Sequence, residues 1–423
     1  MHFVYNWLLR MLTPLVLLRL VWRGFRNHAY WSRWSERFAI NLNLPDRPRL
    51  WIHAVSVGEV RAAIPLVREL RDRYPDHAIL ITTMTPTGSA QVRSAFGDQV
   101  EHCYVPYDLP SVVNRFLNQA NPRLALIMET ELWPNLFHAC GRREIPLVVS
   151  NVRMSEKSLK GYMKVKSFAS STLSQVRVFA CQGEQDAHRM LQIGALKQQI
   201  KVTGSLKFEY RFPASLTEQG DILRQHWGAA RLVWTAASTR EGEEEFVFSA
   251  YKELKNIFSD LLLVVVPRHP ERFNHVVRLA EQTGFSVQRR SEHPNTIDES
   301  TDILVGDTMG ELLLFISSSD VVYMGGSLVK TGGHNLLEPA AAGKPVVFGP
   351  HMFNFEEISR MVLECGAGAQ IDSPSELAPL IEMYLRNTDL RYTAGQAGKD
   401  LIENNRGALV NNLEIINSIY PVR

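Results

Sequence analysis

Short apolar runs alternate with amphipathic helical patterns along most of this 423-residue chain, and this alternation constrains the fold more than any other feature. The run at residues 261–266 contains only Leu and Val, which is typical of a parallel strand buried on both faces. After an earlier run at residues 50–55, apolar side chains recur at helical spacing from Val60 to Tyr74. Repeated βα units of this kind predict an α/β fold with doubly wound parallel sheets.

Two series of such units are present, and a stretch rich in Gly, Pro and mixed polar residues separates them after residue 202. We therefore predict two Rossmann-like domains that face a cleft. Their expected extents are residues 36–205 and 229–423, with a linker at residues 206–228 and a separate N-terminal segment at residues 1–35. The expected strands lie at residues 50–55, 78–82, 124–128, 146–149 and 177–180, and at residues 231–237, 261–266, 302–305, 320–324 and 345–348.

The N-terminal segment is mostly apolar at residues 3–22, but Arg10, Pro14 and Arg19 interrupt it. On a helix, Arg19 and the next arginines fall on one side and apolar residues cover most of the rest. This pattern predicts a helix lying in the interface of an anionic bilayer. A helix packed on its own domain and a short membrane span are the alternatives. A secretory signal is disfavoured because the positive charges follow the apolar core, and their position favours a body on the cytoplasmic side.

Charge and cysteine usage exclude several functional classes. The chain carries 46 Lys and Arg against 44 Asp and Glu, but five arginines and no acid fall in the first 35 residues, which leaves the body slightly acidic. Such a body lacks the broad positive field typical of nucleic-acid binding. The four cysteines are widely spaced, and the sequence holds no Asp-x-Asp, His-Glu-x-x-His or P-loop motif. We therefore expect metal-independent chemistry in a reducing compartment, with no cofactor and no nucleic-acid partner.

Ligands of open parallel sheets bind beyond the carboxyl ends of the strands, and the first such position holds a carboxylate. Residues 53–59 read His-Ala-Val-Ser-Val-Gly-Glu, so a strand would break near Ser56 and Gly58 and a helix would open with Glu59. Glu59 could face the cleft as a functional group or satisfy free N–H groups at the helix start. The helix N-terminus would lower the pKa of Glu59, so burial would have to raise this pKa for a base working near neutral pH.

Two further acids, Glu129 and Glu131, follow the strand expected at residues 124–128. They would share one face if the strand continued, and in so apolar a context they suggest a polar site. Alternatively, Glu131 caps the next helix. A basic run between residues 153 and 166 indicates a solvated helix face, or a surface that holds the phosphates of an acidic acceptor.

Strand ends of the second series carry hydrogen-bond donors and glycines. Gly332 and Gly333 would expose N–H groups at a helix start, a ready anion site, unless they form an ordinary glycine turn. One turn later, Glu338 could accept the hydrogens of ribose hydroxyls. Four other side chains are suited to binding oxyanions or the edge of a base: Ser238, Thr239, Arg240 and Arg268.

These motifs together resemble the 3-deoxy-D-manno-oct-2-ulosonic acid (Kdo) transferases of lipopolysaccharide synthesis. That family, glycosyltransferase family 30, consists of membrane-associated enzymes with the GT-B fold. The resemblance covers nearly the whole chain, from the N-terminal segment to the C-terminal helices. The motifs that carry it lie at residues 53–59, 82–88, 128–135, 203–207, 266–272 and 325–338.

The resemblance implies an inverting, metal-independent transfer of Kdo from CMP-Kdo to the 6′-hydroxyl of a lipid A precursor, lipid IVA, with further Kdo residues added by some members. It also implies an N-terminal acceptor domain, a C-terminal donor domain, and a location on the cytoplasmic face of the inner membrane, whose lipids the N-terminal helix contacts. A nucleotide-sugar epimerase or hydrolase and a non-catalytic nucleotide-sensing module are the competing hypotheses.

Roles for individual residues follow from the same resemblance. Glu59 is implied to be the catalytic base. The acceptor side is implied to include Ser56, Gly58, Glu129 and Glu131. The donor side is implied to include Lys207, Ser238, Thr239, Arg240, Pro267, Arg268, His269, Gly325, Gly326, Ser327, Gly332, Gly333, His334, Asn335 and Glu338.

Overall fold

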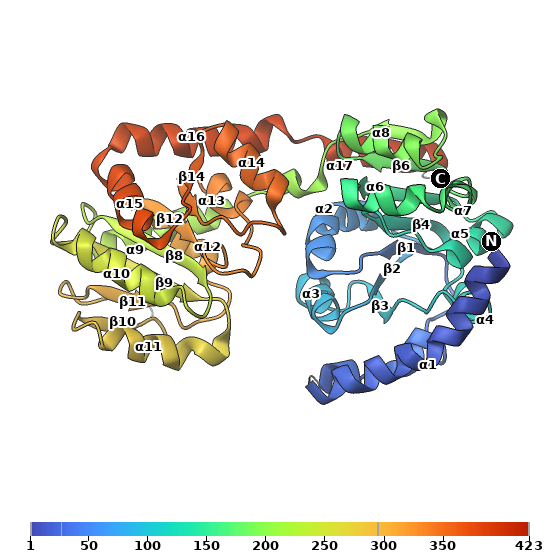
Figure 1. Ribbon diagram of the computed structural model, residues 1–423, viewed down its shortest axis with the longest axis horizontal. Coiled ribbons are helices and arrows are strands. Elements are labelled where there is room, and N and C mark those ends of the chain that lie inside the picture. The colour runs from blue at the N-terminus through green and yellow to red at the C-terminus, as the bar shows by residue number, and fades with distance from the viewer. Residues whose placement is uncertain (1, 27, 294–295, 422–423) are drawn as a thin grey trace. The chain divides into compact units, whose positions relative to one another are not determined.

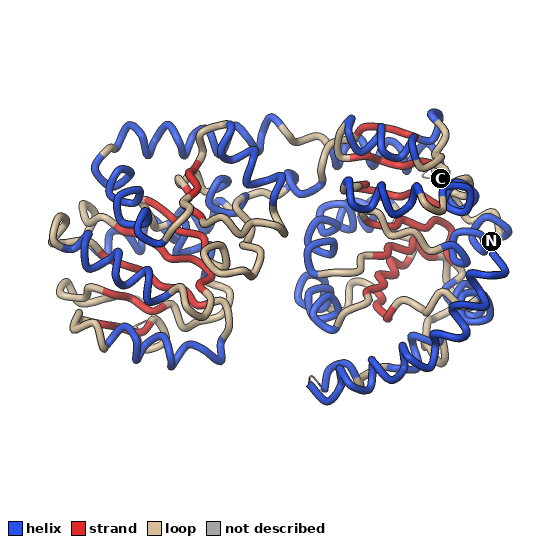
Figure 2. The backbone as a smooth tube through the Cα atoms, viewed as in Figure 1, coloured by secondary structure: helices blue, strands red, loops and turns tan. Residues whose placement is uncertain are grey.

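The computed structural model describes residues 2–26, 28–293 and 296–421 of the chain. The chain divides into two compact units: unit 1 comprises Met1–Glu209 together with Asn405–Arg423, and unit 2 comprises Tyr210–Asn404. In each unit a parallel sheet lies at the centre and helices cover both of its faces (Figure 1 and Figure 2). The predicted α/β fold with two doubly wound sheets is thus confirmed.

The sheet of unit 1 has seven strands, which are β1 (Arg49–His53), β2 (Ala78–Thr83), β3 (Glu101–Tyr104), β4 (Pro122–Met128), β5 (Leu147–Val152), β6 (Val178–Cys181) and β7 (Ile200–Val202). Their order is β3-β2-β1-β4-β5-β6-β7, and every pair is parallel. The order reverses between β1 and β4. The carboxyl ends of these two strands are therefore where such a sheet binds ligands.

Apolar side chains at alternate strand positions fill a core on each face of this sheet. In β1, Trp51 belongs to one core and Leu50 and Ile52 to the other, and all three are fully buried. The helices that cover the two faces are α2 (Val57–Arg73), α3 (Pro86–Phe96), α4 (Pro110–Ala120), α5 (Pro134–Arg142), α6 (Glu156–Met163), α7 (Lys166–Leu173), α8 (Glu184–Gln192) and α17 (Ala408–Ile419).

The sheet of unit 2 also has seven strands, which are β8 (Val233–Thr239), β9 (Leu262–Pro267), β10 (Val287–Arg289), β11 (Ile303–Val305), β12 (Val321–Met324), β13 (Val346–Phe348) and β14 (Gly368–Gln370). Their order is β10-β11-β9-β8-β12-β13-β14, with all pairs parallel, and it reverses between β8 and β12.

In the described part of unit 2, eight α-helices surround the sheet. They are α9 (Ala214–Trp227), α10 (Glu244–Lys255), α11 (Phe273–Glu281), α12 (Leu312–Ser317), α13 (Leu337–Ala341), α14 (Glu356–Glu364), α15 (Leu377–Arg386) and α16 (Thr388–Asn404). As in unit 1, successive residues of a central strand enter different cores: Leu263 and Val265 of β9 belong to one, and Leu262 and Val264 to the other.

The boundaries of the units differ from those expected. The predicted linker at residues 206–228 contains the 3₁₀ helix η4 (Leu206–Glu209) of unit 1 and α9 of unit 2, whose Trp227 is buried in a core. The predicted C-terminal domain at residues 229–423 ends early, because Leu413 of α17 is buried in a core of unit 1. A sequence pattern shows that these helices are amphipathic, but not which sheet receives their apolar faces.

The N-terminal helix α1 (His2–Arg26) is attached to unit 1 near its start and exposes most of its apolar surface. The Tyr5 hydroxyl donates to Oδ2 of Asp108 at 2.8 Å. Farther along, Leu18 and Phe25 are 64% and 69% exposed. Among the described residues, α1 is the one helix long and apolar enough to cross a membrane, and only 6% of its most apolar window is buried. Packing on its own domain therefore leaves most of this helix uncovered.

Candidate functional site

The turn between β1 and α2 places Glu59 where the strand order of unit 1 reverses. Ser56 is the N-cap of α2, and its hydroxyl oxygen accepts from the Glu59 N–H at 3.4 Å. The Glu59 carboxylate accepts in turn from the Val55 N–H at 2.7 Å and from the Ser56 hydroxyl at 2.8 Å. Side chains at a helix start commonly satisfy its free N–H groups in this reciprocal way. The helix-start role is therefore present, and it fixes the orientation of the carboxylate.

Burial gives the Glu59 carboxyl an unusual proton affinity. Glu59 is only 7% exposed. Burial, together with the negative charge of Glu129, raises the pKa of Glu59 to about 7. The hydrogen bonds from Val55 and Ser56 act in the opposite direction and are outweighed. The sequence left open whether the helix start would lower the pKa of Glu59 or burial would raise it. In the structure the effect of burial is the larger one. A pKa near neutrality is what a general base needs in order to be both available and strong enough.

Glu129 and Glu131 lie after the end of β4 and do not continue that strand. Glu129 has a left-handed backbone with φ of 56°, so the strand stops at Met128 and the predicted shared strand face does not form. Glu131 accepts from Nε1 of Trp133 at 3.2 Å, and burial and the charge of Glu129 raise its pKa. The N-cap of α5 is Trp133, so Glu131 does not cap this helix as the alternative supposed.

Lys207 lies with these acids in unit 1. Its Nζ atom is 3.2 Å from Oε1 of Glu129. Lys207 belongs to η4, and this short helix is held by Asn151, whose Oδ1 atom accepts from the N–H of Leu206 at 3.0 Å. The ends of β1, β4 and β5 thereby bring together three carboxylates and one ammonium group.

Two buried polar residues behind this group were not identified from the sequence. Asn151 is fully buried and adopts a left-handed backbone with φ of 58° at the end of β5. His53 is also fully buried; its Nδ1 lies 2.9 Å from Oγ1 of Thr82, and its ring makes a T-shaped contact with the ring of Trp133. Burial lowers the pKa of His53 to about 4, so its ring is neutral. The signal that could have singled out Asn151 is an asparagine at the end of an apolar strand, because Asn adopts the left-handed backbone more readily than most residues.

In unit 2, a buried carboxylate joins the loops that follow β8 and β12. Glu243 accepts hydrogen bonds from the backbone N–H groups of Arg240, Gly326, Ser327 and Leu328 at 2.6–3.1 Å, and from a tyrosine hydroxyl. Only glycine fits at Gly325, because a Cβ atom there would lie 2.7 Å from the backbone of the residues that end β8. Glu243 was not predicted from the sequence, although it lies only three residues after Arg240, which was.

Basic side chains gather beside these loops. Arg240 contacts the ring nitrogens of His269 and His334, the latter at 3.4 Å, and burial and the charge of Arg268 lower its pKa. Arg268 is exposed, and its side chain has no hydrogen-bond or ion-pair partner among the described residues. Arg272 instead forms a two-pronged pair with the buried carboxylate of Glu244. The group can therefore offer cationic donors to an anion, chiefly through Arg240 and Arg268.

Several predicted donor-side residues have structural partners instead of free groups. The Ser327 hydroxyl is fully buried and donates to a backbone carbonyl, and the Thr239 hydroxyl donates to Oε1 of Glu244. Gly332 and Gly333 do not start a helix, because α13 begins four residues later and the Gly333 N–H donates to the carbonyl of Gly326. Their left-handed backbones turn the chain back onto the preceding loop. The alternative of a glycine turn is therefore the correct one here.

The remaining predicted residues lie near the same loops. Pro267 ends β9, while Ser238 is the last residue but one of β8 and has a left-handed φ of 56°. Asn335 accepts from the Leu337 N–H at 3.2 Å at the start of α13, which carries Glu338 in its first turn. In the described part of the chain, no three His, Cys, Asp or Glu side chains are grouped so that they could hold a metal ion.

Comparison with known proteins gives a consistent result. A family model described as 3-deoxy-D-manno-octulosonic-acid transferase (kdotransferase) matches residues 32–210. The chain is 41% identical over 420 residues to a 3-deoxy-D-manno-octulosonic acid transferase of Haemophilus influenzae, covering 98% of both chains. It is 35% identical to the enzyme of that name from Bordetella pertussis, covering 86% of both.

A solved structure shows the same fold. The crystal structure of a glycosyltransferase from Rickettsia africae covers 88% of this chain and 98% of its own, with a TM-score of 0.56 and 14% sequence identity. At this level of identity, the likeness supports the predicted GT-B type of α/β fold and nothing about the substrate.

Proposed function

Because the chain belongs to the family of 3-deoxy-D-manno-octulosonic acid (Kdo) transferases, we propose that it moves Kdo from CMP-Kdo to the 6′-hydroxyl of a lipid A precursor, lipid IVA. The transfer inverts the anomeric carbon and needs no metal ion. The observation that carries this proposal is the buried, oriented carboxylate of Glu59, whose pKa is raised to about 7 at the point where the sheet order reverses.

In the proposed step, Glu59 removes the proton of the acceptor hydroxyl while that oxygen attacks the anomeric carbon of Kdo. The bond from this carbon to the phosphate oxygen breaks, and its electron pair leaves with CMP. Ser56 and Val55 keep the carboxylate in place, and its raised pKa makes it a stronger base than an exposed glutamate. Glu59 then releases the proton to water.

On the donor side, we assign the phosphate of the leaving CMP to the basic group of unit 2. Arg240 and Arg268 supply guanidinium charge there without a metal ion. Glu338, in the first turn of α13, is the candidate acceptor for the ribose hydroxyls. Glu243 fixes the loops that carry these residues but has no free position for a ligand, since five donors already surround its carboxylate.

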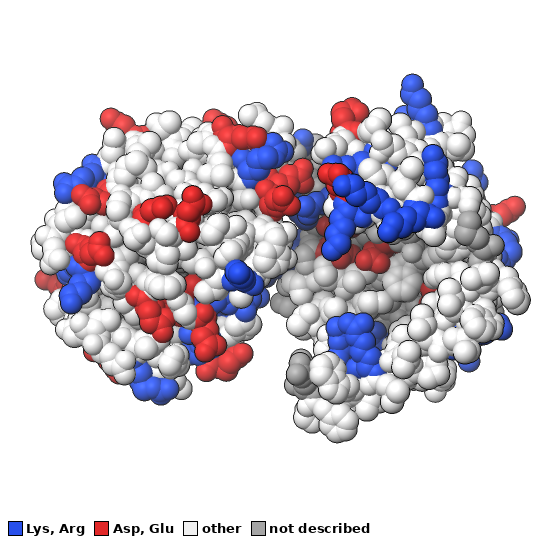
Figure 3. Space-filling model, viewed as in Figure 1, with Lys and Arg blue, Asp and Glu red and all other residues white. Residues whose placement is uncertain are grey.

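A lipid acceptor also fits the surface of unit 1. Figure 3 shows unit 1 hollowed between α1 and a group of basic side chains, with acidic side chains at the back of the hollow. The exposed lysines of α6 and the segment after it, Lys157, Lys160 and Lys164, belong to the basic run that could hold phosphates of the acceptor. With the apolar face of α1 in the cytoplasmic leaflet of the inner membrane, the acceptor would be reached without leaving the bilayer.

The test is incubation of the purified protein with CMP-Kdo, generated in place, and a tetraacylated lipid A precursor, with products read by mass spectrometry. The wild type is expected to add one or more Kdo-sized increments, and Glu59→Ala to add none while still binding CMP. Glu184→Ala is the matched control, because Glu184 is an exposed first-turn acid of α8 outside the site.

Two results would contradict the proposal. Substantial transfer by Glu59→Ala would remove the assigned role of that carboxylate. Release of free Kdo with no transfer to the lipid would favour a hydrolase instead.

A further inference from the structure

A second, separate basic pocket lies at the edge of unit 1, away from the turn that carries Glu59. It has a volume of about 460 Å³ and is lined by Arg33, Arg93, Gly97, Asp98, Val100 and His102. Arg33 comes from the segment that follows α1, Arg93 from the last turn of α3, and His102 from β3. Such a volume lies within the range of pockets that bind small molecules or headgroups.

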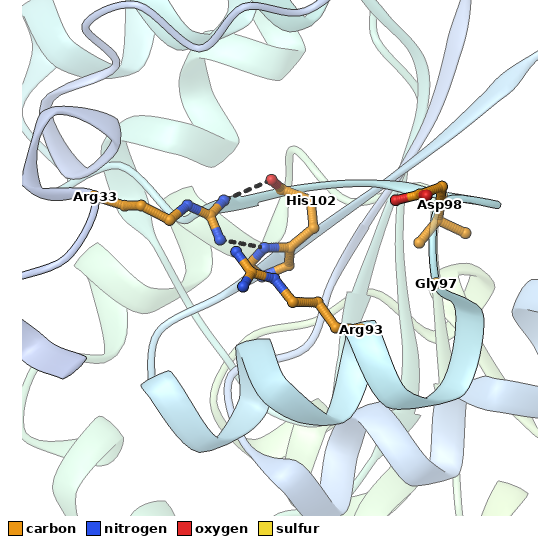
Figure 4. Close-up of a pocket in the computed structure, with 6 residues that line it drawn as sticks. Arg33, Arg93, Gly97, Asp98 and His102 are labelled. Carbon is orange, nitrogen blue, oxygen red and sulfur yellow. Dashed lines mark hydrogen bonds between the residues drawn. The ribbon is translucent and has the colours of Figure 1, made fainter.

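Two guanidinium groups converge in this pocket. Figure 4 shows the side chains of Arg33 and Arg93 directed toward the ring of His102, with Asp98 apart from them. Arg33 is fixed: its Nη2 atom donates to the His102 carbonyl at 2.7 Å and its Nε atom pairs with Glu36 at 2.6 Å.

Arg93 is different, because its side chain has no hydrogen-bond or ion-pair partner among the described residues, and it is exposed. Burial and the two nearby guanidinium groups lower the pKa of His102 to about 3, so its ring adds no charge. The two ring nitrogens lie 3.0 Å from Nη1 of Arg33 and 3.0 Å from Oγ1 of Thr83, so the ring helps to hold Arg33 in place. The pocket therefore holds two converging guanidinium groups, one held rigidly (Arg33) and one without a hydrogen-bond or ion-pair partner in the described part of the chain (Arg93). A guanidinium group can donate two parallel hydrogen bonds to the oxygens of a phosphate, so this pair suits a phosphate ligand. Asp98 is the one carboxylate among the lining residues.

The pocket is tied to the exposed apolar helix. Trp31, two residues before Arg33, donates from its Nε1 atom to the Val21 carbonyl of α1 at 3.2 Å. The Trp31 ring also packs edge-on against Phe25, which is 69% exposed. Trp31 therefore joins the last turns of α1 to the segment that carries Arg33. A phosphate seated beside Arg33 would lie close to the apolar surface that α1 presents.

We propose that this pocket binds the phosphate of a lipid headgroup when α1 lies on the membrane. The inference rests on the membrane attachment proposed above but concerns a site that plays no part in the transfer step. It gives unit 1 a polar anchor in addition to the apolar one. Two such signals together hold a protein on a bilayer much better than either one alone.

The experiment measures partition of the full chain onto three kinds of vesicle: phosphatidylcholine alone, phosphatidylcholine with phosphatidic acid, and phosphatidylcholine with cholesteryl hemisuccinate at matched surface potential. The last two carry the same charge, but only phosphatidic acid presents a phosphomonoester. We expect wild-type protein to prefer the phosphatidic acid vesicles over the hemisuccinate vesicles by about tenfold, as a bidentate guanidinium site would.

Three variants localise the effect. Arg93→Gln is expected to abolish the preference, and Arg93→Lys, which keeps the charge but loses the planar fork, to retain a minor part of it. Arg68→Gln is the matched control, because Arg68 is an exposed arginine of α2 outside the pocket. Partition onto phosphatidylcholine alone should not change in any of them.

Other outcomes separate the possible errors. Equal binding to the two anionic vesicles, or an unchanged preference in Arg93→Gln, would overturn the pocket while leaving the attachment of α1 intact. Failure to bind any vesicle would overturn the attachment itself, and this inference with it. If millimolar inorganic phosphate binds in calorimetry without lipid and cancels the preference, the pocket serves a soluble phosphate and the lipid assignment is wrong.

Discussion

Replacing Glu59 by Gln should stabilise unit 1 at alkaline pH while abolishing transfer. Burial and Glu129 raise the pKa of Glu59 from 4.5 to about 7. Because each tenfold change in proton affinity corresponds to about 1.4 kcal/mol, the ionised carboxylate is about 3 kcal/mol less stable in the folded chain than in the unfolded one. The Gln side chain does not ionise in this pH range, and it can still accept from the Val55 N–H and donate to the Ser56 hydroxyl oxygen.

The sign of the pH dependence follows from the raised pKa. Below about pH 4.5 the carboxyl is protonated in both folded and unfolded chains, so wild type and variant should be equally stable. As the pH rises toward 7, the folded wild type holds its proton more tightly than the unfolded chain, and its stability falls relative to that of the variant. Above pH 7 the variant should be more stable by about 3 kcal/mol.

The assay must resolve the two units, because a chain with two compact units need not unfold in one step. Urea titrations between pH 4.5 and 8.5, read by pulsed hydrogen exchange and mass spectrometry, would follow peptides from β1 and from β9 separately. The transition of β9 is the internal control and should be the same in both proteins. A constant difference across this pH range, or a variant less stable at pH 8, would refute the reasoning about the burial of Glu59.

Three further predictions concern other parts of the molecule. Glu129→Gln removes a charge that raises the pKa of Glu59, so the midpoint of kcat/KM against pH should move below 7. Lys207→Met leaves Glu129 unpaired and should move this midpoint upward. Identical pH profiles for wild type and variants would contradict both expectations. Glu243→Gln leaves backbone N–H groups facing an amide, so thermal unfolding of unit 2 should show a loss of about 3 kcal/mol, and an unchanged melting temperature would argue against that network. Leu15→Asp on exposed α1 should weaken vesicle binding without affecting CMP binding, and equal sedimentation with vesicles would point to another membrane surface.

The central strands could be predicted from the sequence, but the sheet edges could not. All ten expected strands are present, and the four missed ones, β3, β7, β10 and β14, are the outermost strands of the two sheets. A central strand is covered on both faces and therefore reads as a continuous apolar run. An edge strand has three or four residues here and is only partly buried, so it leaves little apolar signal.

The candidate site shows the same division between local and distant information. The helix start at Glu59 follows from seven consecutive residues, and the structure contains it. The pairing of Lys207 with Glu129, and of Glu243 with the loop after β12, joins residues that are far apart in the sequence. Gly332 and Gly333 were predicted to open a helix, but their left-handed backbones send the chain back to Gly326. Such partners depend on how the chain turns, which spacing alone does not determine.

The return of α17 to unit 1 has a consequence for the making of this protein. Ala408, Leu413 and Ile416 complete the core that contains Leu50 and Ile52, yet all of unit 2 is encoded between them. During translation, one apolar face of the unit 1 sheet therefore stays incompletely covered until the whole of unit 2 has been synthesised. We expect nascent unit 1 to recruit chaperones over this interval, and release from them to coincide with the emergence of α17.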